Sequence, residues 1–162
     1  MTRLLVVSDS HGDIGALRRA VLAGAAKYGP ADLLLHCGDG ARDPERIRDT
    51  LREMNPAIRF LAVRGNCDGA SCDGIPYERA VEIEELRLYM THGHRQAVKS
   101  THLLLEDEAR DAGCSIALFG HTHVPFMDMA SVLLLNPGCA RDGHYLVLEV
   151  LGNRPRIHLD RV

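Results

Sequence analysis

The amino-acid sequence predicts an α/β fold whose parallel half grades into antiparallel strands. Apolar runs too short for helices recur along the chain and stop at glycine and polar residues, as buried strands do. Amphipathic stretches of helical period separate the early runs. Later stretches alternate apolar and polar residues, a pattern typical of antiparallel strands covered on one face. Two face-to-face sheets with helices outside would accommodate all three observations.

The first strand–helix–strand unit lies near the N-terminus. Residues 4–7 are apolar and predict a buried strand. The following helix is expected over residues 13–28, with Asp13 capping its start and Gly29 and Pro30 ending it. The next apolar run, residues 33–35, predicts the second strand, and such a unit is right-handed and parallel.

A second unit of the same kind follows. Asp43 is expected to cap its helix, with Pro44 at the first helical position. Asn55 and Pro56 end the helical pattern, and residues 60–63 predict a third parallel strand.

The second half of the chain changes character. Small and turn-forming residues predict a loop over 69–76. Alternating patterns then predict antiparallel strands at residues 81–83 and 86–90. A third helix is expected over residues 98–112, where apolar residues recur at helical spacing, and Gly113 ends it.

The C-terminal part is predicted to be rich in strands. Two further apolar runs, residues 116–119 and 132–135, predict buried strands. The second is followed by a turn at Asn136-Pro137-Gly138. Residues 145–151 and 156–159 then predict a closing hairpin.

Length and composition indicate one domain spanning residues 1–162, with the 46% hydrophobic and 25% charged content of a soluble globular protein. The net charge of −3 argues against binding to a nucleic-acid backbone. The N-terminus offers too few apolar residues for a signal peptide or a membrane span. Five cysteines without framework spacing are expected to be free thiols. We therefore expect a cytoplasmic protein.

Polar side chains follow five of the predicted strands. Along an extended backbone alternate residues share a side, so Asp9 and His11 should project together beyond the first strand. Alone, this pair would be interpreted as a turn cap and a surface histidine. The pattern recurs, however, and open α/β sheets place active sites at the carboxyl ends of their strands. The other strand ends supply Asp39, Asn66, His92, His121 and His123.

Carboxylate, imidazole and amide ligands without thiolate suit borderline-hard divalent ions. Seven ligands exceed what one ion with open positions uses, so two ions sharing a carboxylate are expected. Such a centre keeps a positive charge after its carboxylates are counted, and should attract an anion. Two ions roughly 4 Å apart activate water for in-line attack at phosphorus. Phosphoester hydrolysis is therefore the leading function.

The motifs Asp9-Ser10-His11, Gly38-Asp39, Gly65-Asn66, Thr91-His92-Gly93-His94 and Gly120-His121-Thr122-His123 resemble those of the calcineurin-like metallophosphoesterase superfamily. The small phosphodiesterases of the YfcE type are the most similar branch. The resemblance implies a four-layer α-β-β-α sandwich and a dinuclear centre, commonly of Mn²⁺, with Fe, Zn, Ni or Mg as alternatives. It implies one metal held by Asp9, His11, Asp39 and His123, and another held by Asp39, Asn66, His92 and His121. Asp39 would bridge the two.

One position departs from the wider superfamily. Many members have histidine after the motif asparagine, where it helps the leaving group, but this chain has Cys67. His94 is the candidate substitute, so the expected catalytic residues are Asp39, Asn66 and His94. Asp68 is expected to orient its neighbours through hydrogen bonds, and His36 to be a core residue or a support for the ligands.

The expected partner is a small phosphoester, without nucleic acid or membrane, and the chain could form a homo-oligomer. A second hypothesis is a non-catalytic, metal-binding interaction scaffold, because related eukaryotic proteins of this fold serve as interaction subunits. The complete ligand set favours catalysis, and loss of metal binding would favour the scaffold. A single-metal redox site is a weaker third option, because seven ligands exceed a facial triad.

Overall fold

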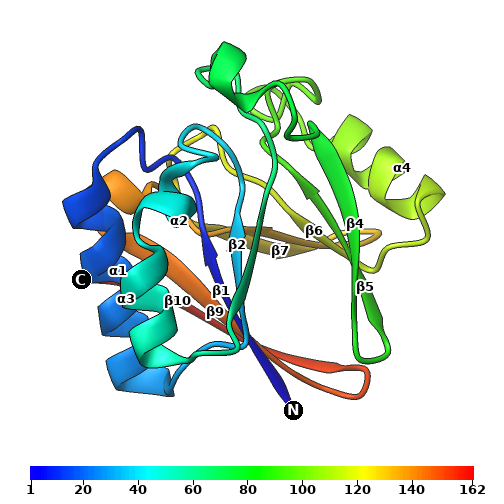
Figure 1. The fold of residues 1–162 in the computed structure, drawn as a ribbon. Coiled ribbons are helices and arrows are strands. Elements are labelled where there is room, and N and C mark those ends of the chain that lie inside the picture. The colour runs from blue at the N-terminus through cyan, green and yellow to red at the C-terminus, as the bar shows by residue number, and fades with distance from the viewer.

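The computed structural model describes residues 1–162, whose strands form two five-stranded sheets (Figure 1). In the first sheet β1 is central and parallel to β2, which is parallel to β3. The C-terminal hairpin completes this sheet because β9 pairs antiparallel with β1. The order is β10-β9-β1-β2-β3, with bounds β1 (Thr2–Val7), β2 (Leu33–His36), β3 (Arg59–Ala62), β9 (His144–Leu151) and β10 (Arg154–Arg161).

The second sheet is formed by the segment between β3 and β9. Its strands β5, β6 and β8 are parallel, and an antiparallel strand closes each edge. The order is β4-β5-β6-β8-β7, with bounds β4 (Glu78–Ile83), β5 (Leu86–Thr91), β6 (Ile116–Leu118), β7 (Phe126–Met129) and β8 (Leu133–Asn136).

Four α-helices lie outside the two sheets. They are α1 (Ile14–Tyr28), α2 (Asp43–Arg46), α3 (Arg48–Met54) and α4 (Leu103–Asp111), and short 3-10 turns occur at Ala70–Cys72 and Ala140–Asp142. The predicted ends of α1 are confirmed: the Asp13 carboxylate accepts a hydrogen bond from the Ala16 N–H at 2.9 Å. Gly29 ends the helix at φ 92°, a conformation that favours glycine.

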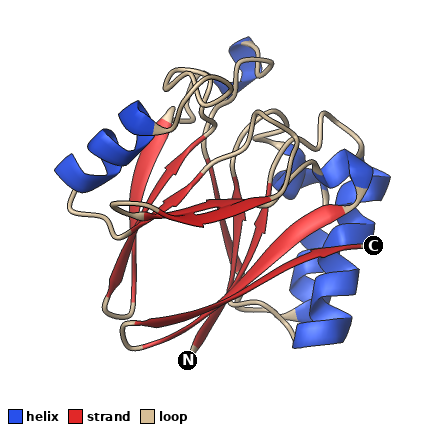
Figure 2. Cartoon of the chain, turned by 180° about the vertical axis from the view of Figure 1, so that it is seen from behind, coloured by secondary structure: helices blue, strands red, loops and turns tan.

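The alternation of side chains along the strands creates four layers. Leu4 of β1 faces the second sheet, whereas Leu5 packs against the helices α1 and α3. In β5, Met90 lies between the sheets and Tyr89 packs on the other side with Leu105 of α4. Figure 2 shows the same arrangement from behind, with helices on both outer sides of the strands. The predicted α-β-β-α sandwich is confirmed.

The loops after β1, β2, β5 and β6 meet at one end of this sandwich. The Asp9 N–H donates to the Gly38 carbonyl at 3.0 Å, and the Gly120 N–H donates to the His92 carbonyl at 2.9 Å. A third contact joins the two sheets, because the His121 N–H donates to the Asp9 carboxylate at 3.1 Å. The fold thus gathers loops from four strands around one place.

Two local predictions are wrong, and one strand was not predicted. Asp43 does not cap its helix, because its carboxylate accepts hydrogen bonds from the Ser10 hydroxyl and the Gly12 N–H, and that helical segment breaks at Ile47. The third helix begins at Leu103 rather than at residue 98, because Ala97 adopts φ 53° and turns the chain. Strand β7 was not predicted, since it is an edge strand with mostly exposed side chains.

None of the helices is long and apolar enough to cross a bilayer.

Candidate metal centre

The backbone carries the candidate ligands in an unusual conformation. Five of them lie just past strand ends with left-handed φ, namely Asp9 (57°), His11 (50°), Asp39 (56°), His121 (68°) and His123 (63°). Left-handed geometry costs a residue with a Cβ roughly 1–2 kcal/mol, and such strain gathers at functional sites. The expectation that Asp9 and His11 continue an extended strand is therefore wrong. Tight turns, rather than alternation, bring their side chains together.

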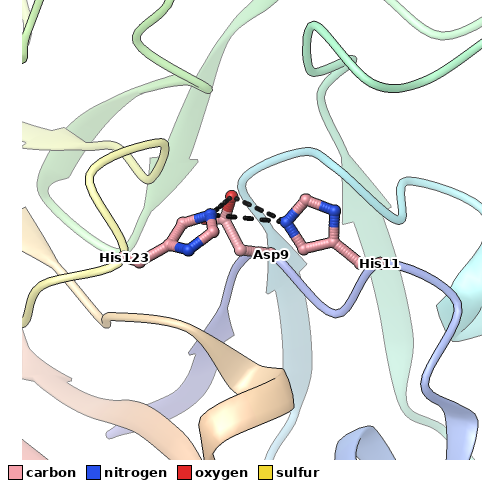
Figure 3. A group of neighbouring side chains, drawn as sticks. All are labelled: Asp9, His11 and His123. Carbon is pink, nitrogen blue, oxygen red and sulfur yellow. Dashed lines mark hydrogen bonds and ion pairs between the residues drawn. The ribbon is translucent and has the colours of Figure 1, made fainter.

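Asp9 is fully buried and lies between two histidines from opposite sides of the centre (Figure 3). Its Oδ1 atom lies 3.1 Å from His123 Nε2 and 3.6 Å from His11 Nε2. The two imidazole Nε2 atoms are 3.4 Å apart. The other oxygen, Oδ2, accepts hydrogen bonds from the Ser8 hydroxyl at 2.6 Å and from the His121 N–H at 3.1 Å. One oxygen is thus fixed by the protein while the other faces the histidines.

Asp39 and His92 form the second part of the centre. The His92 Nδ1–H donates to the Cys37 carbonyl at 2.7 Å, so Nε2 is the nitrogen that faces the carboxylates and would carry the lone pair in the neutral ring. This Nε2 atom lies 3.3 Å from Asp39 Oδ2 and 3.9 Å from Asp9 Oδ1. Burial opposes the charge of Asp39, but the adjacent His92 ring and the hydrogen bond from the Cys67 N–H hold the pKa of its carboxyl well below the usual range.

Two further histidines lie beside His92. Its ring centroid is 5.0 Å from that of His121 and 5.5 Å from that of His94. Burial and the neighbouring His92 lower the pKa of His121 to about 4 and also lower that of His94. Both rings are therefore neutral near pH 7, as metal-binding or proton-accepting imidazoles must be.

The remaining predicted residue, Asn66, is exposed. It lies beside Asp39, because the backbone N–H of the following residue, Cys67, donates to Asp39 Oδ1 at 2.8 Å. The Cys67 side chain reaches the centre. Its sulfur, a His11 nitrogen and an Asp39 oxygen all lie within 4.8 Å of one another. Desolvation and the Asp39 carboxylate raise the pKa of the Cys67 thiol.

Asp68 connects the two loops that carry Asp39 and Asn66. Its Oδ2 accepts hydrogen bonds from the N–H groups of Asp39 and Gly65 at 2.9 and 2.8 Å. Its Oδ1 accepts from those of Gly40 and Ala41 at 2.9 and 3.2 Å. Asp68 thus orients its neighbours, as expected from the sequence.

The buried His36 side chain makes a hydrogen bond to the loop after β1. Its Nδ1 accepts a hydrogen bond from the Gly38 N–H at 3.1 Å, so Nε2 bears the proton and donates to the Ser10 hydroxyl at 2.8 Å. Ser10 in turn donates to Asp43 at 2.6 Å. Complete burial lowers the pKa of His36 to about 4. The side chain is a core residue that positions the neighbour of two candidate ligands.

Two glycines allow the loops to approach this closely. A Cβ at Gly65 would lie 2.2 Å from Asp39 Oδ1, and one at Gly120 would lie 1.9 Å from Ser8 Oγ and 2.7 Å from Asp9 Oδ2. No side chain could replace either hydrogen without moving a carboxylate of the centre.

The donor set fits divalent metal ions. Asp9 Oδ1 and His92 Nε2 are buried and make no hydrogen bond. Leaving a carboxylate oxygen buried and unsatisfied is costly unless a cation compensates it. Carboxylate and imidazole atoms converge in three overlapping groups, which are Asp9 with His11 and His123, Asp9 with Asp39 and His92, and His11 with Asp39 and Cys67. Overlap at both aspartates suits two neighbouring ions.

A cleft of about 390 Å³ opens beside the centre. Its lining residues include His11 and Asp39 of the centre, together with Arg42 and Arg46. The arginines were not singled out from the sequence, because nothing in their spacing distinguishes them from surface residues. Their position at the two ends of α2, directly after the Asp39 loop, was the available signal.

A sequence model of the calcineurin-like phosphoesterase superfamily domain matches residues 2–151. The chain belongs to this superfamily. The probable metallophosphoesterase YsnB of Bacillus subtilis is 30% identical over 85% of this chain and 75% of its own length. Phosphodiesterase YfcE of Escherichia coli is 29% identical over 85% of this chain and 79% of its own length. The predicted family is thus confirmed, and it implies divalent metal ions.

Solved structures of this phosphoesterase fold superpose over nearly the whole chain. A novel archaeal phosphodiesterase gives a TM-score of 0.73 at 22% identity, covering 98% of this chain and 99% of its own. Vps29 of Chaetomium thermophilum gives 0.74 at 17% identity, covering 100% and 97%. At these identities the likeness shows the fold alone.

Proposed function

We propose that this phosphoesterase is a phosphodiesterase that uses two divalent metal ions, with Mn²⁺ as the first candidate. The observation that carries the proposal is the pair of unsatisfied buried atoms, Asp9 Oδ1 and His92 Nε2, which face one another across 3.9 Å. The names of the relatives support the diester preference, since YfcE is a phosphodiesterase.

The proposed ligand roles are those that the resemblance to the superfamily implies. Asp39 Oδ2, at 3.3 Å from His92 and 3.9 Å from His11, is suited to bridge the ions. One ion would be held by Asp9, His11, Asp39 and His123, and the other by Asp39, Asn66, His92 and His121. When bound, the ions would polarise the phosphoryl oxygens and lower the pKa of water at the site.

The remaining groups act on the substrate. Asn66 is exposed beside the bridge and can contact a phosphoryl oxygen as well as an ion. His94 has a buried Nδ1 without a hydrogen-bond partner and a lowered pKa, so it is a neutral imidazole free to bind substrate or exchange a proton. The proposed substrate is a small, soluble diester. The proposed compartment is the cytoplasm, because the five free thiols support a reducing environment.

The test combines metal content with activity. The protein is reconstituted with Mn²⁺, its metal content is measured, and hydrolysis of bis(4-nitrophenyl) phosphate and 4-nitrophenyl phosphate is compared. We expect close to two ions per chain and a preference for the diester. His92→Ala should abolish turnover, while His102→Ala, which removes a ring packed on Phe119 and Phe126, should retain it.

The Vps29 likeness keeps one alternative in view, a metal-binding interaction scaffold without catalysis. The same experiment distinguishes the two. A chain that binds two ions and hydrolyses neither ester, or that binds none, would contradict the phosphodiesterase.

A further inference from the structure

The cleft lies on one side of the metal centre, the side of His11, Asp39 and Cys67. Its walls include His11, Asp39 and Cys67, but neither His92 nor His121. A substrate with its phosphorus at the metals can therefore extend one ester group past Cys67 toward Arg42 and Arg46.

The walls of this cleft are polar. Among the lining residues only Cys67 and Cys72 are hydrophobic, and no aliphatic, Phe, Tyr or Trp side chain is present. A volume of about 390 Å³ lies near the lower end of the range for small-molecule sites. The cleft therefore suits a compact polar group rather than a nucleobase or an acyl chain.

The acidic side chains of the cleft are already occupied. Both oxygens of Asp68 accept backbone hydrogen bonds. Asp43 Oδ2 accepts from Ser10 and Gly12, and Asp39 Oδ1 accepts from the Cys67 N–H. These hydrogen bonds hold the carboxylates in place and favour their charged form, so the attraction for an anion has to come from the arginines and from bound metal ions.

The two arginines retain free donors. Arg42 is held in place by its Nε–H, which donates to the Ser71 carbonyl, and by Nη1, which pairs with Glu45 at 2.9 Å. Its Nη2 makes no hydrogen bond in the structure. Arg46 has only a loose contact, 3.8 Å from its Nη1 to Asp43 Oδ1, and its side chain is 60% exposed. The guanidinium groups can therefore meet an incoming anion, for which their forked donors are best matched to phosphate.

We propose that the natural substrate is a phosphodiester in which one ester group carries a second phosphate, and that Arg42 and Arg46 bind this phosphate. The inference rests on the proposed function for the position of the reacting phosphorus. Arg42 positions the cleft wall and supplies one donor, whereas Arg46 is the freer cation and the specificity-determining residue.

The first experiment measures binding alone. The probes are ethane-1,2-diol bisphosphate and ethyl phosphate, titrated into the Mn²⁺-loaded protein by calorimetry. The wild type should bind the bisphosphate at least tenfold more tightly. Arg46→Gln should reduce this ratio by about fivefold to tenfold, the effect of one charge-assisted hydrogen bond in a partly exposed site. The matched control is Arg52→Gln on the exposed surface of α3, which should leave the ratio unchanged.

The second experiment measures specificity. It compares kcat/KM for 4-nitrophenyl diesters whose other ester group is ethyl or 2-phosphoethyl. The phosphorylated ester should be preferred, and Arg46→Gln should reduce the preference through KM rather than kcat.

Equal binding of the two probes by the wild type, or an equal ratio in wild type and Arg46→Gln, would overturn the inference. A protein that binds the bisphosphate through Arg46 but hydrolyses neither diester would instead refute the proposed function and leave the phosphate site standing.

Discussion

Asp68 shows how one side chain outside the ligand set can position the bridge. It is the only acceptor for four backbone N–H groups of the Asp39 and Asn66 loops. In Asp68→Asn one oxygen becomes an amino group, so two of these N–H groups would face a donor. Losing such support typically weakens metal binding 10- to 100-fold.

We therefore expect the Mn²⁺ dissociation constant of Asp68→Asn to rise about tenfold. Calorimetric titration measures it. Asp73→Asn is the control, because Asp73 is an exposed carboxylate paired with Arg64 on the same loop. Equal affinities in both variants would mean that the loops are held by other contacts.

His36 should make the metal-free protein sensitive to acid. Its pKa is about 4 when folded and about 6.5 when unfolded, so the unfolded chain binds the proton first. Stability is then complete above pH 6.5 and is lost as pH falls toward 4. Between pH 7 and pH 5 this residue should remove about 2 kcal/mol from the free energy of unfolding.

Urea unfolding at both pH values, in a chelating buffer, measures this loss. Other histidines with lowered pKa values contribute as well, so the quantity compared is the difference between wild type and His36→Gln. The variant should lose less stability on acidification. A pH dependence identical to that of the wild type would exclude His36 as its source.

Cys67 should limit the departure of poor leaving groups. Its thiol lies at the centre, but its raised pKa makes it a weak proton donor. General acid catalysis contributes about 10²- to 10⁴-fold in rate, mainly for alkoxide leaving groups. Cys67→His should raise kcat/KM for alkyl diesters more than for nitrophenyl diesters. An unchanged ratio at equal metal occupancy would indicate that His94 or water already supplies the proton.

At the scale of the elements, the close approach of the loops after β1 and β6 depends on Gly120. A methyl group there would meet the Ser8 hydroxyl and the Asp9 carboxylate. Gly120→Ala should displace Asp9, lowering turnover and destabilising the fold by about 1–3 kcal/mol. Gly74→Ala is the matched control, since a Cβ at Gly74 meets nothing within 4 Å and Gly74 does not line the cleft. Turnover and thermal unfolding of both variants check the expectation.

The elements also explain what the sequence could predict. Buried strands such as residues 33–36 are visible as apolar runs, and Asp13 and Gly29 mark the ends of α1 by local chemistry. The start of α4 was misjudged because Val98 continues the helical spacing while Ala97 turns the backbone. Strand β7 exists through pairing with β8 rather than through a pattern of its own.

The candidate site could be predicted as a set of residues but not as a geometry. The strand ends located Asp9, His11 and Asp39, yet their left-handed backbone depends on hydrogen bonds between distant loops. The cleft with Arg42 and Arg46 was missed for the same reason, since its other wall comes from the loop after β3.

At the scale of the whole molecule, bound metals would join the two sheets. Asp9 and Asp39 follow strands of the first sheet, and His92 and His121 follow strands of the second. Mn²⁺ at 100 times its dissociation constant should stabilise the fold by about 2.7 kcal/mol and raise the Tm by roughly 5–10 °C.

Asp39→Ala should abolish activity and this increase in Tm while remaining folded, because its loss relieves buried negative charge in the metal-free protein. Asp49→Ala, at an exposed position of α3, should keep both. Thermal unfolding with Mn²⁺ or with chelator measures the effect. An equal increase in Tm for Asp39→Ala would show that this carboxylate holds no ion.

The pairing of β1 with β9 has a consequence for synthesis on the ribosome. Thr2 lies opposite Val150, so the central strand of the first sheet gains its second neighbour only after the entire second sheet has been made. Until then one edge of an apolar strand stays open to other nascent chains. The strand that protects this edge of β1 is therefore translated only after the whole second sheet.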